Sequence, residues 1–276
     1  FLNVQRTMRA KVPFGIAQIG KAFRNEITPG NFIFRTREFE QMEHQLFCKE
    51  QDGVEFYELY KKLALNFLLS IGIKQQNLRY KDHDKLAHYA KCACDIQYNY
   101  PMGWSELNGI HHRGCHDLSR HQEYSGKSML YTDPISNEKY IPTVIENSIG
   151  ADRLMLAVLC DAYDEQVLDN GETRVVLHLH PSIACYKVAV LPLQKNLSDK
   201  ANEVYNKLAK YFYTDYDESG SIGKRYRRQD EIGTPYCVTI DFTTLEDNTI
   251  TIRDRDTMEQ KRMTIEEVIA FLHDKM

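Results

Sequence analysis

Residues 23–43 hold the densest set of side chains that could bind a charged ligand. The segment begins Phe-Arg-Asn-Glu, passes through Thr-Pro-Gly-Asn at 28–31, and continues as an alternating stretch. Because successive side chains of a strand point to opposite faces, we expect a hairpin with one shared charged and aromatic face. Burying such charges is costly unless they are paired or meet a charged ligand. The set suits a ligand with an anionic end, a planar ring and an ammonium group, which ATP and an amino acid together provide. Its members are Arg24, Glu26, Arg35, Arg37, Phe39, Gln41 and Glu43.

The pattern Phe-Arg-x-Glu, a loop, and Arg-x-x-Glu-Phe-x-Gln resembles motif 2 of the class II aminoacyl-tRNA synthetases, in its glycyl-tRNA synthetase form. The resemblance implies that Arg24 binds the α-phosphate of ATP. There it would stabilise the transition state as the amino-acid carboxylate attacks phosphorus. The resemblance also implies that Phe39 stacks under adenine. The other ATP contacts that it implies in this segment are Asn25, Glu26, Phe34, Arg35, Thr36, Arg37 and Glu38.

Gly150-Ala151-Asp152-Arg153, followed by an apolar stretch, is similar to motif 3 of the same family. The resemblance implies that all four residues contact ATP and that Arg153 covers the other face of adenine, since a guanidinium stacks well on a purine. Glu106, with Leu107 beside it, resembles the carboxylate that helps hold ATP-bound Mg²⁺, an ion bound by one or two carboxylates and phosphates. The catalytic residues that the resemblance implies are Arg24, Glu26 and Arg153.

The resemblance further implies an amino-acid pocket, in which carboxylates hold the ammonium group of glycine and an arginine holds its carboxylate. Filling the pocket with carboxylates leaves no room for a side chain. Because larger substrates are then excluded sterically, no editing domain would be needed. The implied glycine contacts are Phe39, Glu40, Gln41, Met42, Glu43, Arg113, Glu146, Asn147, Ser148, Ile149 and Gly150.

A second group of candidate ligands comprises His111-His112-Arg113-Gly114-Cys115-His116 together with Cys92 and Cys94. Zinc sites favour Cys-x₂₋₄-Cys spacings with a second pair elsewhere. Cys92 and Cys94 are too close for that pattern, and His111 and His112 are adjacent, so we expect no zinc. The seven cysteines of the chain stand at irregular spacings. They are typical of reduced cytosolic thiols rather than of a disulfide framework.

The elements that must position these residues are predicted from the spacing of apolar side chains. We expect strands at 15–20, within 77–109, and at 140–148. We expect a core-facing helix over 54–71, with its core stripe at Phe56, Tyr60, Leu63, Phe67 and Ile71. Residues 154–163 are apolar all round, which predicts a buried helix. Residues 117–126 are polar and predict a loop, and 164–173 predict a turn or linker.

From about residue 183, strands and helices alternate, which indicates a small α/β domain. Its last predicted helix begins after Thr264, which can form a capping box with Glu267. This region resembles the anticodon-binding domain shared by glycyl, histidyl, prolyl and threonyl synthetases. It contains the one dense basic run, Lys224-Arg225-Tyr226-Arg227-Arg228. The run is either a solvated helix face or an RNA contact with arginines on phosphates. Because the net charge is −4, any RNA contact must be local.

The expected fold is therefore an α+β, antiparallel-sheet class II synthetase core at 1–172, followed by a smaller α/β anticodon-binding domain at 183–276. The expected function is that of a glycine–tRNA ligase, which activates glycine with ATP and transfers it to tRNA(Gly). One alternative is another class II synthetase, for proline or threonine. The other is a non-catalytic class II-like accessory subunit of a mitochondrial DNA polymerase, which need not keep ATP-binding residues such as Arg24 and Arg153.

Two parts of the family pattern are expected upstream of Phe1. They are motif 1, which would form a homodimer, and an Arg-Pro-Glu-Thr segment that would add a glycine-binding carboxylate. No stretch of the sequence approaches the roughly 20 apolar residues of a membrane span, so we expect no membrane partner and a cytoplasmic location.

Overall fold

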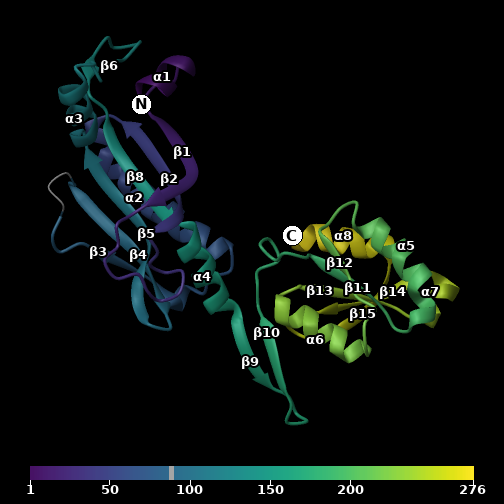
Figure 1. Ribbon diagram of the computed structural model, residues 1–276. Coiled ribbons are helices and arrows are strands. Elements are labelled where there is room, and N and C mark those ends of the chain that lie inside the picture. Colours follow the sequence, from purple (N-terminus) through teal and green to yellow (C-terminus); the bar gives the residue numbers. More distant parts are fainter. Residues whose placement is uncertain (87–89) are drawn as a thin grey trace. The chain divides into compact units, whose positions relative to one another are not determined.

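The computed structural model of the protein describes residues 1–86 and 90–276 (Figure 1). The chain forms two compact units, residues 1–160 and 161–276, each with its own hydrophobic core. Each unit is described by itself. The expected domain limits, 1–172 and 183–276, stay a prediction. None of the helices in the described residues is long and apolar enough to cross a membrane.

The first unit is built on a six-stranded sheet in the order β1-β2-β8-β5-β4-β3, in which every neighbouring pair is antiparallel. This confirms the expected core built on an antiparallel sheet. Its strands are β1 (Phe14–Phe23), β2 (Glu38–Cys48), β3 (Leu78–Asp82), β4 (Cys92–Tyr100), β5 (Gly103–Gly114) and β8 (Thr143–Gly150), with β6 (Tyr131–Thr132) and β7 (Lys139–Tyr140) forming a separate small hairpin. Residues 87–89, within the stretch expected to form strands, lie outside the described residues.

Four α-helices accompany this sheet: α1 (Leu2–Thr7), α2 (Gly53–Ser70), α3 (His116–Ser125) and α4 (Ala151–Ala162). Helix α2 lies on one face of the sheet, against β5 and β8. Its position was predicted correctly, and its core stripe was predicted in part, since Phe56, Tyr60 and Ile71 pack against the core. Tyr57, Ala64 and Leu68 are buried, whereas Leu63 and Phe67 are exposed. Because the helix is apolar on more than one side, the sequence pattern alone did not fix which side faces the sheet.

Two further expectations for this unit were wrong. Residues 117–125 belong to helix α3 rather than to a loop, because Leu118 packs into a small core and Gly126, with a positive φ, ends the helix. Helix α4 is not buried all round, since Met155 and Leu159 are exposed.

The second unit contains a five-stranded mixed sheet in the order β12-β11-β13-β14-β15. This confirms the expected α/β fold. Its elements are β11 (Val188–Pro192), α5 (Ser198–Leu208), β12 (Thr214–Tyr216), α6 (Ile222–Ile232), β13 (Tyr236–Ile240), α7 (Phe242–Asp247), β14 (Thr249–Asp254), β15 (Gln260–Thr264) and α8 (Ile265–Lys275). The capping box of Thr264 and Glu267 at the start of α8 is present as predicted.

The stretch 164–173, which was expected to be a turn or linker, contains the turn of a hairpin of β9 (Tyr163–Val167) and β10 (Thr173–Leu177). Asn170-Gly171 supplies its turn. Arg174 of β10 is almost fully buried and pairs with Asp230 of α6 at 2.8 Å. Arg253 of β14 pairs with the same carboxylate at 2.9 Å. The buried ion pair of Arg174 with Asp230 holds the hairpin against the rest of the second unit. The local sequence pattern did not predict it.

Candidate active site

Side chains from neighbouring strands form rows across one face of the six-stranded sheet. The register pairs Glu43 of β2 with Ser148 of β8, and Ser148 with Gly109 of β5. The next row joins Gln45, Glu146 and His111 in the same way. Because every second residue of a strand points to the same face, both rows face the same side. The polar residues that were far apart in the sequence therefore come together on one surface.

A cavity of about 320 Å³ opens over these rows. Its walls come from the segment between β1 and β2, from β2, β5 and β8, and from the start of α4. Most of the residues expected to bind ATP or glycine line it: Arg24, Glu26, Phe34, Arg35, Thr36, Phe39, Gln41, Glu43, Glu106, Leu107, Arg113, Glu146, Ser148, Gly150, Asp152 and Arg153.

Eight expected site residues do not line this cavity: Asn25, Arg37, Glu38, Glu40, Met42, Asn147, Ile149 and Ala151. Three of them, Met42, Asn147 and Ile149, alternate with lining residues and so face the opposite side of the sheet, where they line a more apolar groove. The backbone N–H of Glu40 donates to Asp152 Oδ2 at 3.0 Å, which ties β2 to the first turn of α4. Conversely, Ile33, Gly109 and His111 line the cavity without having been expected there.

The expected strand positions of the first arginines were wrong, although the cluster itself forms. Strand β1 ends at Phe23 and β2 begins at Glu38, so Arg24, Glu26 and Arg35 lie in the connecting segment. There Glu26 pairs with Arg35 at 3.5 Å. The Arg24 guanidinium carbon lies 5.2 Å from the centre of the Phe39 ring. The segment is closed by a bridge between Gly30 and Arg35 rather than by a continued ladder.

Arg153, in the first turn of α4, is held at the cavity by two neighbours. Its Nε donates to the Phe34 carbonyl at 3.0 Å, and its guanidinium carbon lies 4.2 Å from the centre of the Phe34 ring. The same guanidinium pairs with the Glu106 carboxylate at 3.4 Å. Two arginines thus face the cavity from different elements, which is an arrangement suited to an anion with a planar ring.

Glu146, which lines the cavity, is the centre of a polar network. His111 Nδ1 lies 3.0 Å from its carboxylate, Gln45 Nε2 donates at 3.0 Å, and Arg113 approaches to 3.3 Å. Burial by itself would raise the pKa of Glu146, but the hydrogen bonds from His111 and Gln45 and the charge of Arg113 lower it to about 2. Glu146 is therefore a carboxylate at neutral pH.

Arg113 is oriented by Asp117 in the first turn of α3, through bonds of 2.6 and 3.0 Å. Sequence reasoning missed this contact because it took 117–126 for a loop. It considered His111 only as a candidate zinc ligand and did not place it in this cavity. Glu43 makes no hydrogen bond or ion pair within the described part of the chain, which leaves its carboxylate free for a cationic ligand.

The basic run at 224–228 lies on α6 of the second unit, and most of it is engaged. Arg225 is buried and donates to the carbonyls of Pro192 and Gly220. Arg227 pairs with Glu172, and Arg228 with Asp217. The Tyr226 hydroxyl bonds to Thr239. Lys224 is exposed. Most side chains of the basic run therefore make contacts within the second unit.

Comparison with known proteins connects both units to one family. Residues 2–162 match the tRNA synthetase class II core domain (G, H, P, S and T), and residues 187–275 match the anticodon binding domain. Similar curated proteins include the glycine–tRNA ligases of Clostridium kluyveri and Geobacillus kaustophilus, each 58% identical over the whole of this chain. That of Clostridium perfringens is 57% identical. The chain spans about 60% of the length of these relatives. The chain therefore belongs to the class II aminoacyl-tRNA synthetase family.

Proposed function

We propose that the chain provides the ATP and glycine sites of a glycine–tRNA ligase. In the first step a carboxylate oxygen of glycine attacks the α-phosphorus of ATP, which forms glycyl-adenylate and releases diphosphate. In the second step a hydroxyl of the terminal ribose of tRNA(Gly) attacks the glycyl carbonyl, and AMP leaves. The observation that carries the proposal is a single cavity that is lined both by Arg24, Phe39 and Arg153 and by Glu43 and Glu146.

In this proposal the arginine-rich side of the cavity binds ATP. Arg24 contacts the α-phosphate, where a fixed guanidinium stabilises the charge that grows on the non-bridging oxygens. Phe39 and Arg153 hold the adenine ring between them. The Glu106 carboxylate would hold the Mg²⁺ that accompanies ATP, which helps to neutralise the phosphates. No protein nucleophile is needed, because positioning and charge stabilisation account for the chemistry.

The carboxylate-rich side binds glycine. Glu43 and Glu146 receive the ammonium group, and Arg113, held by Asp117, attracts the carboxylate. Ser148, whose Oγ accepts from Gln41 Nε2 at 2.5 Å, adds a polar wall between the two carboxylates. The crowding of these groups leaves little space beside the Cα of the substrate. The pocket is thereby expected to reject larger amino acids by steric exclusion.

The second unit is proposed to bind the anticodon end of the tRNA, which its match to the anticodon binding domain supports. Within the basic run, Lys224 is the side chain best placed for RNA contact, because it is exposed. A homodimer, a cytoplasmic location and domain limits at 1–172 and 183–276 remain parts of the same proposal.

Amino-acid-dependent exchange between ATP and labelled diphosphate tests the proposal. Measured on the full-length gene product, exchange should require glycine and should not occur with proline, threonine or alanine. Exchange with proline or threonine but not with glycine would instead support a sister synthetase. Absence of both exchange and ATP binding would support a non-catalytic class II-like subunit and overturn the proposal.

A further inference from the structure

Two histidines approach each other across a small residue at the other edge of the same sheet. His83 follows directly after β3, and its backbone N–H donates to the carbonyl of Ala93 on β4 at 3.1 Å. On the other side of β4, Ala93 is in register with His111 of β5. The side chain of Ala93 is only a methyl group, so little stands between the two histidine positions on this face. Their centres lie 5.9 Å apart.

A carboxylate completes the group. Asp95 stands two residues after Ala93 on β4 and so points to the same face. Its Oδ1 lies 2.9 Å from His83 Nε2. Its register partner on β5 is Gly109, where a Cβ atom would lie 3.0 Å from His111 Cε1 and 3.7 Å from Asp95 Oδ1. The missing side chain at Gly109 is therefore what allows His111 and Asp95 to approach.

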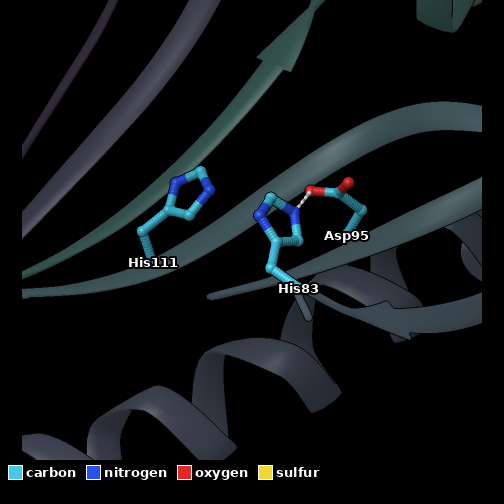
Figure 2. A group of neighbouring side chains, drawn as sticks. All are labelled: His83, Asp95 and His111. Carbon is cyan, nitrogen blue, oxygen red and sulfur yellow. Dashed lines mark ion pairs between the residues drawn. The ribbon is translucent and has the colours of Figure 1, made fainter. Parts of the chain in front are cut away.

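We infer that His83, Asp95 and His111 form a binding site for one Zn²⁺ ion. One ligand atom from each residue lies within 4.8 Å of the others, and Figure 2 shows His83 standing between His111 and Asp95. Two imidazoles and one carboxylate are a ligand set that Zn²⁺ accepts in proteins, with a fourth position open for water or another ligand. The Asp95 and His111 side chains are 14% and 22% exposed, whereas His83 is 34% exposed, so an ion can enter from the His83 side.

The surroundings of His111 support this inference. Its Nδ1 faces the Glu146 carboxylate at 3.0 Å, which leaves Nε2 as the nitrogen for a metal ion. Histidines that bind metals commonly donate their second ring N–H to a carboxylate in this way. Asp95 and Glu146 also offset the charge of a dication. The positive charge of Arg113, two residues after His111 on β5, is paired with Glu146 and Asp117.

The inferred site departs from the expectation that the chain binds no zinc. That expectation considered His111 only with its sequence neighbours up to His116 and with Cys92 and Cys94. His112 is buried on the opposite face of β5, beside Gly53 of α2, and it cannot join the site. A bound ion would link the segment after β3 to β5, and through His111 it would hold Glu146 at the wall of the cavity. The inference does not depend on the proposed ligase activity.

The experiment measures Zn²⁺ binding directly. The full-length protein is stripped with a chelator and titrated with Zn²⁺ alone by calorimetry, and the metal retained after dialysis is counted by elemental analysis. We expect one Zn²⁺ per chain. His83→Ala and Asp95→Asn should each weaken binding at least about 100-fold, since each removes one of three ligands. His121→Ala, an exposed histidine of α3, is the matched control and should bind as the unaltered protein does.

Substitution with Co²⁺ gives a second readout, because a tetrahedral site with nitrogen and oxygen ligands produces visible d–d absorption that His83→Ala should abolish. Circular dichroism verifies that each variant is folded. The inference is overturned if the unaltered protein retains no Zn²⁺, or if both ligand variants bind it as tightly as the control. It is also overturned if Zn²⁺ does not alter the effect of the two substitutions on the thermal midpoint. His83 and Asp95 would then stabilise the fold only through their own contact.

Discussion

Arg24 and Arg120 are both exposed arginines of the first unit, but only Arg24 lines the cavity. Its guanidinium lies over the Phe39 ring, whereas Arg120 pairs with Glu123 on the surface of α3. We predict that Arg24→Ala lowers the rate of glycine-dependent diphosphate exchange by at least about 100-fold, the usual loss when a group that stabilises transition-state charge is removed. Because the side chain is exposed, the midpoint of thermal unfolding should hardly change.

Arg120→Ala is the control for this prediction, and its exchange rate should equal that of the unaltered protein. The two variants differ in position and not in the charge that they remove. An equal loss of exchange in both variants would mean that the exchange rate depends on the net charge of the chain and not on the position of Arg24. An unchanged rate in Arg24→Ala would remove Arg24 from the proposed mechanism.

At the scale of single elements, helix α7 shows how one carboxylate serves two purposes. Asp241 caps the helix by accepting from the backbone N–H of Thr244, and it also binds Arg262 of β15 through two bonds of 2.7 and 2.9 Å. The hydrogen bond from Arg262 is the main reason that the pKa of Asp241 falls to about 2, against the opposing effect of burial. Asp241→Ala should therefore lower the free energy of unfolding by about 1 kcal/mol at pH 7.

That difference should depend on pH. A lowered pKa in the folded state means that ionised Asp241 stabilises the fold above its unfolded pKa of about 3.9. The stabilisation is lost as the pH falls from there toward 2. Urea unfolding at a series of pH values should show the unaltered protein and Asp241→Ala converging below about pH 4. Asp274→Ala, at the exposed end of α8, is the control. A difference that stays constant with pH would contradict the prediction.

The same element scale shows how far sequence reasoning reached. The capping box of Thr264 was predictable because its partner lies three residues later, at the spacing that the motif requires. The alternation of Phe39, Gln41 and Glu43 was predictable for a similar reason, since strand geometry sets it locally. The contacts of Asp241 with Arg262, of Arg113 with Asp117, and of His83 with His111 were not predictable. They depend on strand register and on helix boundaries, which the local pattern does not determine.

At the scale of the whole molecule, the two units have separate cores, and the sequence offers a selective probe. The chain has a single tryptophan, Trp104, which lies on β5 of the first unit. Ile96 on β4 and Ile250 on β14 are both fully buried, one in each core. Replacing either by alanine removes the same atoms and should cost its own unit about 2 to 5 kcal/mol.

We therefore predict that Ile96→Ala lowers the thermal midpoint reported by tryptophan fluorescence, whereas Ile250→Ala does not. Circular dichroism, which detects helices and strands of both units, should show an earlier transition in each variant. Comparing the two variants distinguishes units that unfold independently from units that unfold together. If the two units unfolded together, both variants would lower the fluorescence midpoint equally. If the fluorescence midpoint falls as far with Ile250→Ala as with Ile96→Ala, the two cores are coupled. Damage to the second unit would then disturb the cavity of the first, and variants of the two units could not be interpreted separately.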